Sequence, residues 1–386
     1  METGYDILFF WVARMILMTT YVLGEIPFEK VYLHGLVRDE QGRKMSKSLG
    51  NVIDPLDMIA KYGADATRLS LLIGNTPGND CKLSEDKIAG FRNFANKLWN
   101  VARFILQNAN CKFQNKQPKS ETLSDKWILL RLNETKKTVT ENIEKFNFSY
   151  AGEALRDFTW NELADWYLEI SKIEGDKGEI LNYILETLLK LWHPFMPFVT
   201  ETIWTECKFQ NADCKMLLVS EWPKIEINTK TKIEDFEIIK NIITGIRSLR
   251  ADYKIDPVKK LKVVISAGKK RELIGENADV VKALTRLEDL QINKSTNKPL
   301  NFVGFVVGDV EVFVDLSGVV DFEKEKKRIS DEIENLKKYV AGLENKLGNE
   351  SFVKNAPAQV VENEKNKLAE SKEKLNKLNS QLKHLN

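Results

Sequence analysis

Histidine and cysteine are scarce in this chain, which has three histidines and four cysteines among 386 residues. The cysteines Cys81, Cys111, Cys207 and Cys214 form no Cys-x-x-Cys pair. Zinc sites are usually built from closely spaced cysteine and histidine ligands, so we expect no protein-bound zinc or other resident metal. Isolated cysteines in an otherwise ordinary chain fit a reducing compartment, and we therefore expect a cytoplasmic protein.

The chain also lacks a marked excess of charge of either sign. Its formal net charge of +2 is too small to indicate a polyanionic partner by itself. Any contact with nucleic acid must therefore come from local basic patches. The composition, 43% hydrophobic and 30% charged, is typical of a soluble globular chain with room for two to four domains.

Long hydrophobic runs are absent except for one, Ile7 to Leu23, which has about the length of a short membrane span. Arg14 lies at its middle, where a charge costs roughly 2.5–3.5 kcal/mol on insertion scales. No basic segment precedes the run, so it is also a poor signal peptide. We therefore expect a helix buried in protein and no association with a membrane.

The first 83 residues alternate helix, strand and helix, which is typical of an α/β domain. We expect a helix at Asp6–Leu23 and a buried, parallel-type strand at Lys30–Val37. Asp54 is a good N-cap for a following helix, because its side-chain oxygen can accept a backbone N–H of the first turn. Pro55 also suits the first helical position. Gly63 should end that helix, and Ala64 should begin the next one.

The rest of the chain predicts three further domains. Residues 84–225 read as a helical bundle, with long helices at Ser84–Gln107, Leu123–Lys145, Tyr150–Lys172 and Ile180–Glu206. Residues 226–319 read as a helix followed by a small α+β unit: a strand at Leu261–Ala267, a helix at Ala278–Leu287 and a hairpin at Phe302–Leu316 turning at Gly308. Residues 320–386 carry two heptad seams separated by a break at Gly348–Pro357, which predicts an antiparallel coiled-coil hairpin.

A lysine-containing segment, Gly42 to Asn51, directly follows the predicted strand and contains the run Lys-Met-Ser-Lys-Ser at Lys44–Ser48. We call Lys44–Ser48 the lysine loop. Two lysines three residues apart, among small hydroxyl residues and between glycines, indicate a mobile cationic loop that can close over a polyphosphate. The alternative is a solvated basic turn, which is the usual interpretation of a charge cluster.

The lysine loop resembles the second signature of class I aminoacyl-tRNA synthetases. Together with its surroundings, the chain is similar over essentially its whole length to the valine–tRNA ligase family. The segments that carry the likeness are Glu2–Met15, Tyr32–Val37, the lysine loop, Thr76–Asp80, Asn93–Asn100, Trp192–Phe198 and Phe352–Glu362. Isoleucine and leucine enzymes share the general plan, and an isoleucine–tRNA ligase remains an alternative.

The resemblance implies a Rossmann-type catalytic domain and a two-step reaction. Valine attacks the α-phosphate of ATP, supplied with Mg2+, and the valyl group of the adenylate then moves to tRNA-Val. Lys44 and Lys47 would stabilise the triphosphate as pyrophosphate leaves. By the same resemblance, the ATP- and adenylate-binding residues would be Glu2, Gly4, Asp6, His34, Gly35, Met45, Ser46 and Ser48.

Two of these residues have structural alternatives. Asp6 could simply cap its own helix, an interpretation nearly as good as a ligand role. His34, taken alone, could be a hydrogen-bonded core histidine. Its position at the end of a strand that precedes the lysine loop favours a role in binding, because ligands of α/β sheets bind at the carboxyl ends of strands.

The resemblance also implies that the bundle recognises the tRNA anticodon. Unpaired bases are read by stacking on aromatic rings or arginine planes, and Arg103 and Phe104 are our candidates. Arg247 and Arg250 lie on one helical face and could touch RNA or be solvated. The terminal hairpin has nearly as many acids as lysines, so one face of it would brace the tRNA.

One departure from the family pattern is large. The first signature of class I enzymes, His-x-Gly-His or a close variant, is absent, since no two of His34, His193 and His384 lie three residues apart. We therefore expect the C-terminal portion of an enzyme that is monomeric at full length, inactive without the N-terminal half that holds the valine pocket and the editing domain. An incomplete sheet should also expose apolar surface, including part of the Ile7–Leu23 helix. The alternative is a non-catalytic tRNA-binding protein.

Overall fold

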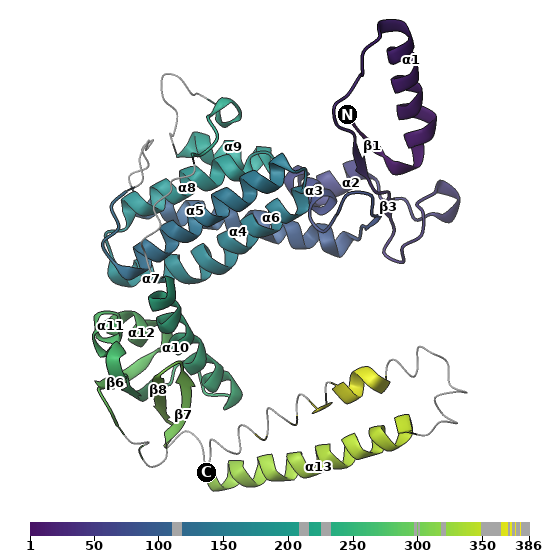
Figure 1. Ribbon diagram of the computed structural model, residues 1–386. Coiled ribbons are helices and arrows are strands. Elements are labelled where there is room, and N and C mark those ends of the chain that lie inside the picture. The colour runs from purple at the N-terminus through teal and green to yellow at the C-terminus, as the bar shows by residue number, and fades with distance from the viewer. Residues whose placement is uncertain are drawn as a thin grey trace. The chain divides into compact units, whose positions relative to one another are not determined.

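The computed structural model describes residues 1–109, 118–207, 216–224, 233–296, 299, 302–317, 322–348, 364–369, 371, 372, 375 and 379. The chain forms two compact units, residues 1–233 and residues 234–386 (Figure 1).

Two short parallel sheets begin the first unit. Strand β1 (Glu2–Gly4) pairs with β2 (Tyr32–His34), and β3 (Val37–Arg38) pairs with β4 (Cys81–Lys82). The single strand predicted at Lys30–Val37 is therefore two strands. The break lies at Gly35–Leu36, where the chain leaves its partner β1 and joins β4.

A helical segment follows β1 and runs through a 3₁₀ turn (Tyr5–Ile7), a π-helix (Leu8–Val12) and helix α1 (Ala13–Leu23). Its apolar side chains are largely exposed, for example Phe9 at 76% and Tyr21 at 87%. The prediction of a buried helix is wrong, because the three-residue strands β1 and β2 offer it no broad apolar face. The expectation that it exposes apolar surface is confirmed. In the part of the chain that the structure describes, residues 5–23 form the one helix long and apolar enough to cross a membrane.

Helices α2 (Pro55–Tyr62) and α3 (Ala64–Leu72) link the lysine loop to the bundle. The predicted cap of α2 is confirmed, since the Oδ1 of Asp54 accepts a hydrogen bond from the backbone N–H of Leu56 at 2.8 Å. Gly63 ends α2 with a φ of +91°, a backbone conformation that favours glycine.

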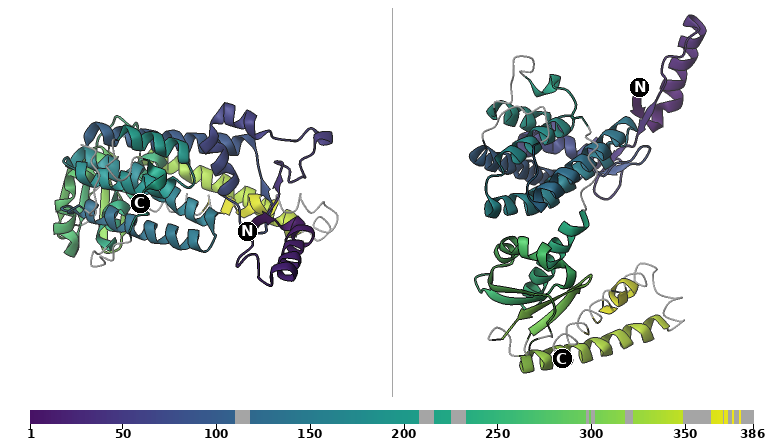
Figure 2. Two further views of the ribbon diagram at one scale, coloured as in Figure 1. Left: turned by 90° about the horizontal axis from the view of Figure 1, so that it is seen from above. Right: turned by 60° about the vertical axis from the view of Figure 1, so that its left-hand side comes forward.

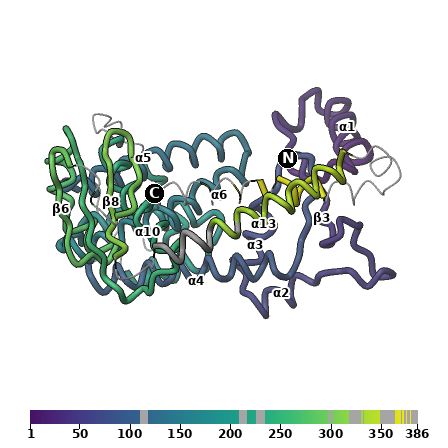
Figure 3. The backbone as a smooth tube through the Cα atoms, turned by 90° about the horizontal axis from the view of Figure 1, so that it is seen from below, coloured from purple at the N-terminus to yellow at the C-terminus, as the bar shows by residue number. Residues whose placement is uncertain are grey.

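The bundle consists of long helices around a buried core that includes Trp127, Trp192 and Trp204 (Figures 1 and 2). Its helices are α4 (Glu85–Asn108), α5 (Leu123–Glu144), α6 (Phe148–Asp157), the π-helix Phe158–Tyr167, α7 (Leu168–Glu174), α8 (Gly178–Trp192) and α9 (Pro197–Glu206). A short 3₁₀ turn follows at Leu217–Val219. Seen from below, α4 extends from the α2–α3 region along the bundle (Figure 3).

The bundle differs from the sequence prediction at one point. The helix predicted at Ile180–Glu206 is two helices, α8 and α9, because Pro194 and Pro197 interrupt it. Pro197 is the first residue of α9, where its missing N–H costs no intrahelical hydrogen bond.

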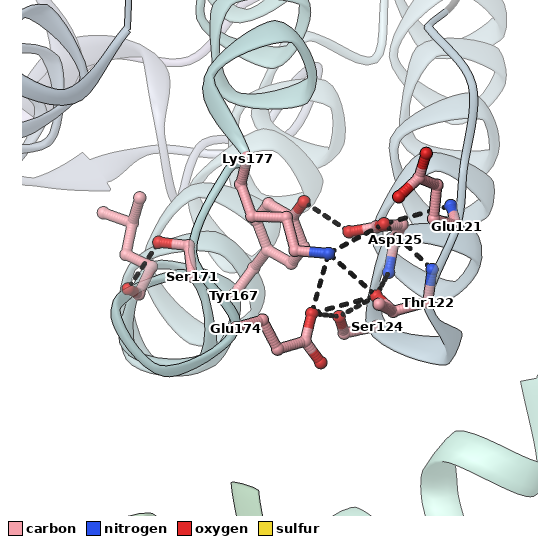
Figure 4. A network of polar contacts seen from close by, with 9 residues as sticks. Glu121, Thr122, Ser124, Asp125, Tyr167, Ser171, Glu174 and Lys177 are labelled. Carbon is pink, nitrogen blue, oxygen red and sulfur yellow. Dashed lines mark hydrogen bonds and ion pairs between the residues drawn. The ribbon is translucent and has the colours of Figure 1, made fainter. Parts of the chain in front are cut away.

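A buried ionic network joins α5, α7 and the start of α8 (Figure 4). The Nζ of Lys177 lies 2.9 Å from Oδ2 of Asp125 and 2.9 Å from Oε2 of Glu174. The hydroxyl of Tyr167 donates a hydrogen bond to Oδ1 of Asp125 at 2.8 Å. Asp125 also accepts the backbone N–H of Thr122, whose side chain completes a capping box at the start of α5.

The second unit begins with helix α10 (Ile233–Asp252) and a mixed four-stranded sheet. The strands are β5 (Leu261–Ser266), β6 (Leu287–Asn293), β7 (Phe302–Val307) and β8 (Val310–Asp315), in the order β6-β5-β8-β7. The predicted hairpin at Gly308 is confirmed as the β7–β8 pair. Between β5 and β6 lie a 3₁₀ turn (Gly268–Lys270) and the short helices α11 (Arg271–Glu276) and α12 (Ala278–Thr285). Strand β6 was not predicted, and the helix expected to reach Leu287 ends at Thr285.

Helix α13 (Phe322–Gly348) contains the first heptad seam, with Ile333, Val340 and Leu343 buried. Two ion pairs connect it to the following segment: Lys346 to Glu364 at 3.2 Å, and Glu344 to Lys372 at 2.7 Å. Residues 364–369 are helical. Val361, Leu378, Leu382 and Leu385 of the second predicted seam lie outside the described residues.

Candidate functional site

Four of the predicted adenylate-binding residues meet at the pairing of β1 with β2. The parallel register places Gly4 opposite His34, and Nε2 of His34 lies 3.2 Å from Oε1 of Glu2. A Cβ at Gly4 would lie 2.7 Å from Oδ1 of Asp6 and 3.5 Å from the ring of His34. The missing side chain of Gly4 therefore leaves room for the carboxylate and the imidazole to approach each other.

The structural alternatives for Asp6 and His34 do not hold. The 3₁₀ turn that contains Asp6 has no side-chain capping bond. The side chain of His34 is 46% exposed, which rules out a core histidine. Its Nδ1 lies 2.8 Å from the carbonyl oxygen of Gly35, so that the backbone fixes the orientation of the ring. Both side chains are therefore exposed at the surface of the cluster.

Asp80 ties this cluster to the strand that precedes the lysine loop. Its Oδ1 accepts hydrogen bonds from the Tyr5 hydroxyl at 3.0 Å and from the Leu36 backbone N–H at 2.8 Å, and its Oδ2 pairs with Arg38. The Leu36 N–H and then Arg38 lower the pKa of this carboxyl, so Asp80 is held as the anion. Asp80 belongs to the Thr76–Asp80 segment that carries part of the family resemblance, and no role was predicted for it.

Gly35 has a packing role beside its predicted role in binding. A Cβ there would lie 1.7 Å from the carbonyl oxygen of Asn79, which is backbone and cannot swing away. We predict that Gly35→Ala destabilises the chain by about 1–3 kcal/mol, because β2 and the Asn79 turn must separate. Thermal and denaturant unfolding measure this loss. Gly90→Ala is the control. Its Cβ would enter open space on α4, and alanine there should raise the free energy of unfolding by about 0.5–1 kcal/mol. Equal stabilities of the two variants would refute the packing role.

The lysine loop is held at both ends by one carboxylate. Oδ1 of Asp39 accepts the backbone N–H of Arg43 at 2.7 Å, while Oδ2 accepts Nε of Arg43 at 2.8 Å and Nδ2 of Asn51 at 2.9 Å. Asn51 in turn donates to the carbonyl oxygen of Lys44 at 3.2 Å and accepts the N–H of Ser46 at 2.9 Å. We call Asp39, Arg43 and Asn51 the loop frame.

The two lysines of the loop, Lys44 and Lys47, are exposed. No carboxylate in the described ranges forms an ion pair with either lysine. Ser46 caps the short 3₁₀ turn Lys47–Leu49 by accepting the Leu49 N–H, and its Oγ lies 3.2 Å from that of Ser48. Met45 is half-buried. A loop with fixed ends and two unneutralised ammonium groups is suited to contact a polyanion.

The frame predicts how Asp39 responds to pH. Hydrogen bonds from Asn51 and then Arg43, opposed by burial, lower the pKa of the Asp39 carboxyl to about 2. Because the folded pKa is depressed, its contribution is present above the ordinary value of about 3.9 and is lost as the pH falls toward 2. We expect the Asp39 carboxyl carbon signal to stay unchanged by NMR from pH 6 to pH 3. A midpoint close to 4 would show that the frame is not formed.

The candidate anticodon residues lie near the end of α4. Arg103 is exposed and Phe104 is half-buried, with Nζ of Lys172 at 5.3 Å from the centre of the Phe104 ring. An aromatic ring with a cation over its face is a feature of sites that stack unpaired bases. Arg103 and Phe104 lie on α4, and no contact among the described residues joins them to the β1–β2 cluster.

Arg247 and Arg250 are not simply solvated, because both side chains donate hydrogen bonds to backbone carbonyl oxygens. Nε of Arg247 donates to the carbonyl oxygen of Leu284 at 3.1 Å, and Arg250 donates to the carbonyl oxygen of Lys259 at 2.7 Å.

Across the residues that the structure describes, no group of three His, Cys, Asp or Glu side chains could hold a metal ion.

Three family models match the chain. Residues 1–84 match class I tRNA synthetases (I, L, M and V), residues 125–265 match the anticodon-binding domain of tRNA ligase, and residues 321–386 match the valyl tRNA synthetase tRNA binding arm. The fold is similar to that of LeuRS from Agrobacterium radiobacter, solved in a ternary complex with tRNA and LeuAMS. That likeness has a TM-score of 0.51 at 23% identity and covers 67% of this chain and 35% of the LeuRS.

Curated relatives carry the likeness along nearly the whole chain. This chain is 41% identical to a valine–tRNA ligase from Geobacter sulfurreducens over 96% of the length of this chain. It is 39% identical to one from Syntrophotalea carbinolica and 39% identical to one from Thermotoga maritima, in each case over 99% of this chain. The chain spans 44% of the length of each of these relatives. It therefore belongs to the valine–tRNA ligase family of the class I tRNA synthetases and corresponds to the C-terminal portion of its members.

Proposed function

We propose that this chain acts as the C-terminal part of a valine–tRNA ligase, which forms valyl-adenylate from valine and MgATP and transfers the valine to tRNA-Val. The observation that carries the proposal is the lysine loop. Lys44 and Lys47 are two cations that form no ion pair with any described carboxylate, on a segment whose ends are fixed by Asp39 and Asn51. A protein that only binds tRNA has no use for a loop built to close over a polyphosphate.

In this proposal the protein provides positioning and charge. The attack of the valine carboxylate on the α-phosphate of ATP breaks the bond to pyrophosphate, which leaves with added negative charge. Lys47 and Lys44 would stabilise that charge, and the hydroxyls of Ser46 and Ser48 would donate to the phosphates. Met45, whose side chain is half-buried, would seat the loop.

On the other side of the adenylate, the β1–β2 cluster would bind the sugar and the substrate ammonium. The carboxylates of Glu2 and Asp6 can accept hydrogen bonds from ribose hydroxyls or from an ammonium group. His34 stands at the carboxyl end of β2, with the backbone of Gly35 beside it, which is where α/β sheets bind ligands.

The remaining domains would bind tRNA-Val. Arg103 and Phe104 would contact the anticodon through stacking, and the segment from α13 onward would form an antiparallel coiled-coil arm that braces the tRNA. The ion pairs Lys346–Glu364 and Glu344–Lys372 support the antiparallel arm, because their order along the two segments is reversed. We further propose a cytoplasmic enzyme, monomeric at full length, and the absence of a Cys-x-x-Cys pair from the sequence supports the cytoplasmic location.

The specificity of the proposal is testable by aminoacylation. The chain is combined with the region of the Geobacter relative that it does not cover, and valine or isoleucine is offered with tRNA-Val or tRNA-Ile. We expect charging of tRNA-Val with valine. Charging of tRNA-Ile instead would indicate that this chain serves an isoleucine enzyme. Binding of tRNA without charging in any combination would favour a non-catalytic tRNA-binding protein.

A further inference from the structure

Three arginines line one cavity of about 390 Å³ in the second unit. Arg247 and Arg250 come from the last turns of α10, and Arg286 follows α12 directly. Pro257 and the end of α12 form the remaining walls. We call this cavity the arginine pocket. Arg247 and Arg250 were predicted as RNA contacts. Arg286 was not, because it lies 36 residues further along the chain than Arg250.

Backbone carbonyl groups hold all three guanidinium groups in place. Arg250 donates to the carbonyl oxygens of Lys259 at 2.7 Å and Asp256 at 3.1 Å, and Arg286 donates to that of Pro257 at 2.7 Å. Arg247 donates to the carbonyl oxygen of Leu284 at 3.1 Å. Each guanidinium has five N–H groups, so these bonds orient the side chain and leave donors for a ligand.

The backbone of Arg286 has an unusual conformation. Its φ is +55°, in the left-handed region that glycine usually occupies after a helix. An arginine at this position costs conformational energy that glycine would avoid. The residue found here nevertheless brings a third guanidinium to the pocket.

Two of the three arginines form no ion pair within the described part of the second unit: neither Arg250 nor Arg286 pairs with a described acid. The Oδ1 of Asp256 accepts the backbone N–H of Val258 at 2.8 Å. Burial and then the nearby Arg286 lower the pKa of Arg250, and only Asp256 opposes them. Arg250 and Arg286 are therefore held by backbone carbonyl oxygens and not by ion pairs with the described acids.

We propose that the arginine pocket binds a phosphate group of the tRNA backbone. Planar guanidinium groups hold phosphate oxygens through paired N–H donors, and clustered arginines are the common solution for this ligand. No aromatic side chain lines the pocket, which favours phosphate over base recognition. The proposal rests on the proposed function, since that function supplies tRNA as the ligand.

The test compares two variants of the full chain that each remove one arginine of the second unit. Arg286→Gln removes an arginine of the pocket. Arg271→Gln is the matched control, because Arg271 is also exposed and also donates to one backbone carbonyl oxygen, that of Ile292 at 3.4 Å, but lies outside the pocket. We expect Arg286→Gln to bind tRNA-Val roughly tenfold more weakly. It should also lower the slope of log affinity against log salt by about 0.7–0.9, the value of one phosphate contact. The control should change neither quantity, and equal behaviour of the two variants would overturn the proposal.

A second measurement needs no variant. The arginine Nε–H signals of the wild-type chain are followed by NMR during titration with tRNA-Val or with inorganic phosphate at matched ionic strength. We expect tRNA to shift the signals of the pocket arginines at concentrations where inorganic phosphate does not. Shifts with inorganic phosphate and none with saturating tRNA would show that the pocket takes a free anion, which overturns the assignment to RNA. Absence of any tRNA binding by the wild-type chain would instead refute the proposed function.

Discussion

Lys47→Ala is expected to slow valyl-adenylate formation by about 100- to 1,000-fold in the enzyme completed with its N-terminal counterpart. The reason is that Lys47 is exposed, forms no ion pair with a described carboxylate and lies on a loop with fixed ends, so its charge can act on the leaving pyrophosphate. An interaction made mainly in the transition state lowers the rate of the chemical step and leaves ground-state binding largely unchanged. Single-turnover formation of the adenylate measures this rate.

The control for this prediction is Lys137→Ala, which removes an exposed lysine from α5. Its rate of adenylate formation should equal that of the wild type. Binding of tRNA-Val by Lys47→Ala should also be close to that of the wild type. Equal losses in adenylate formation and in tRNA binding would mean that the lysine loop is an RNA contact and has no role in adenylation.

Lys177→Met should destabilise the first unit by about 3 kcal/mol, the largest stability effect that we expect from a single substitution. The side chain of Lys177 is only 7% exposed and that of Asp125 only 1%, so removal of the ammonium leaves a buried carboxylate without its cation. Burial raises the pKa of Asp125, but the hydrogen bonds from Thr122, Lys177 and Tyr167 outweigh burial and lower it. Donors other than Lys177 remain in the variant, which places the loss at the lower end of the range for broken buried pairs.

Denaturant unfolding of the two variants Lys177→Met and Lys172→Met measures this effect. Lys172 is an exposed lysine that pairs with Glu169 at 2.5 Å, and its loss should cost no more than about 0.5 kcal/mol. The stability that depends on Asp125 should be fully present above the ordinary carboxyl pKa and should decrease as the pH falls below it. Equal stabilities of the two variants at neutral pH would contradict a structural role for the network in Figure 4.

Features that depend on neighbouring residues could be read from the sequence. The Asp54–Pro55 start of α2, the Gly63 stop and the β7–β8 hairpin at Gly308 each follow from local backbone preferences, and all are present. The division of residues 180–206 into two helices was missed. The prolines that cause it were visible, but the apolar periodicity on either side outweighed them.

Features that depend on distant partners could not be read in this way. Strand β6 is specified by its parallel pairing with β5, and its own residues carry only a weak alternating pattern. The bonds of Asp80 to Tyr5 and Leu36 span 75 and 44 residues, so no spacing rule indicates them. The lysine loop itself was visible as a charge pattern, whereas Asp39, which fixes its ends, gave no signal that separates it from a solvated acid.

We propose that the lysine loop forms one wall of an adenylation site, and that the region of the relatives that this chain does not cover supplies the other wall. Valine-dependent exchange of pyrophosphate into ATP tests it most directly, with the chain alone and with the chain combined with the uncovered region of the Geobacter relative. We predict no exchange by the chain alone and clear exchange by the combination, with the latter abolished by Lys47→Ala. Robust exchange by the chain alone, or exchange by the combination that does not depend on Lys47, would contradict the claim.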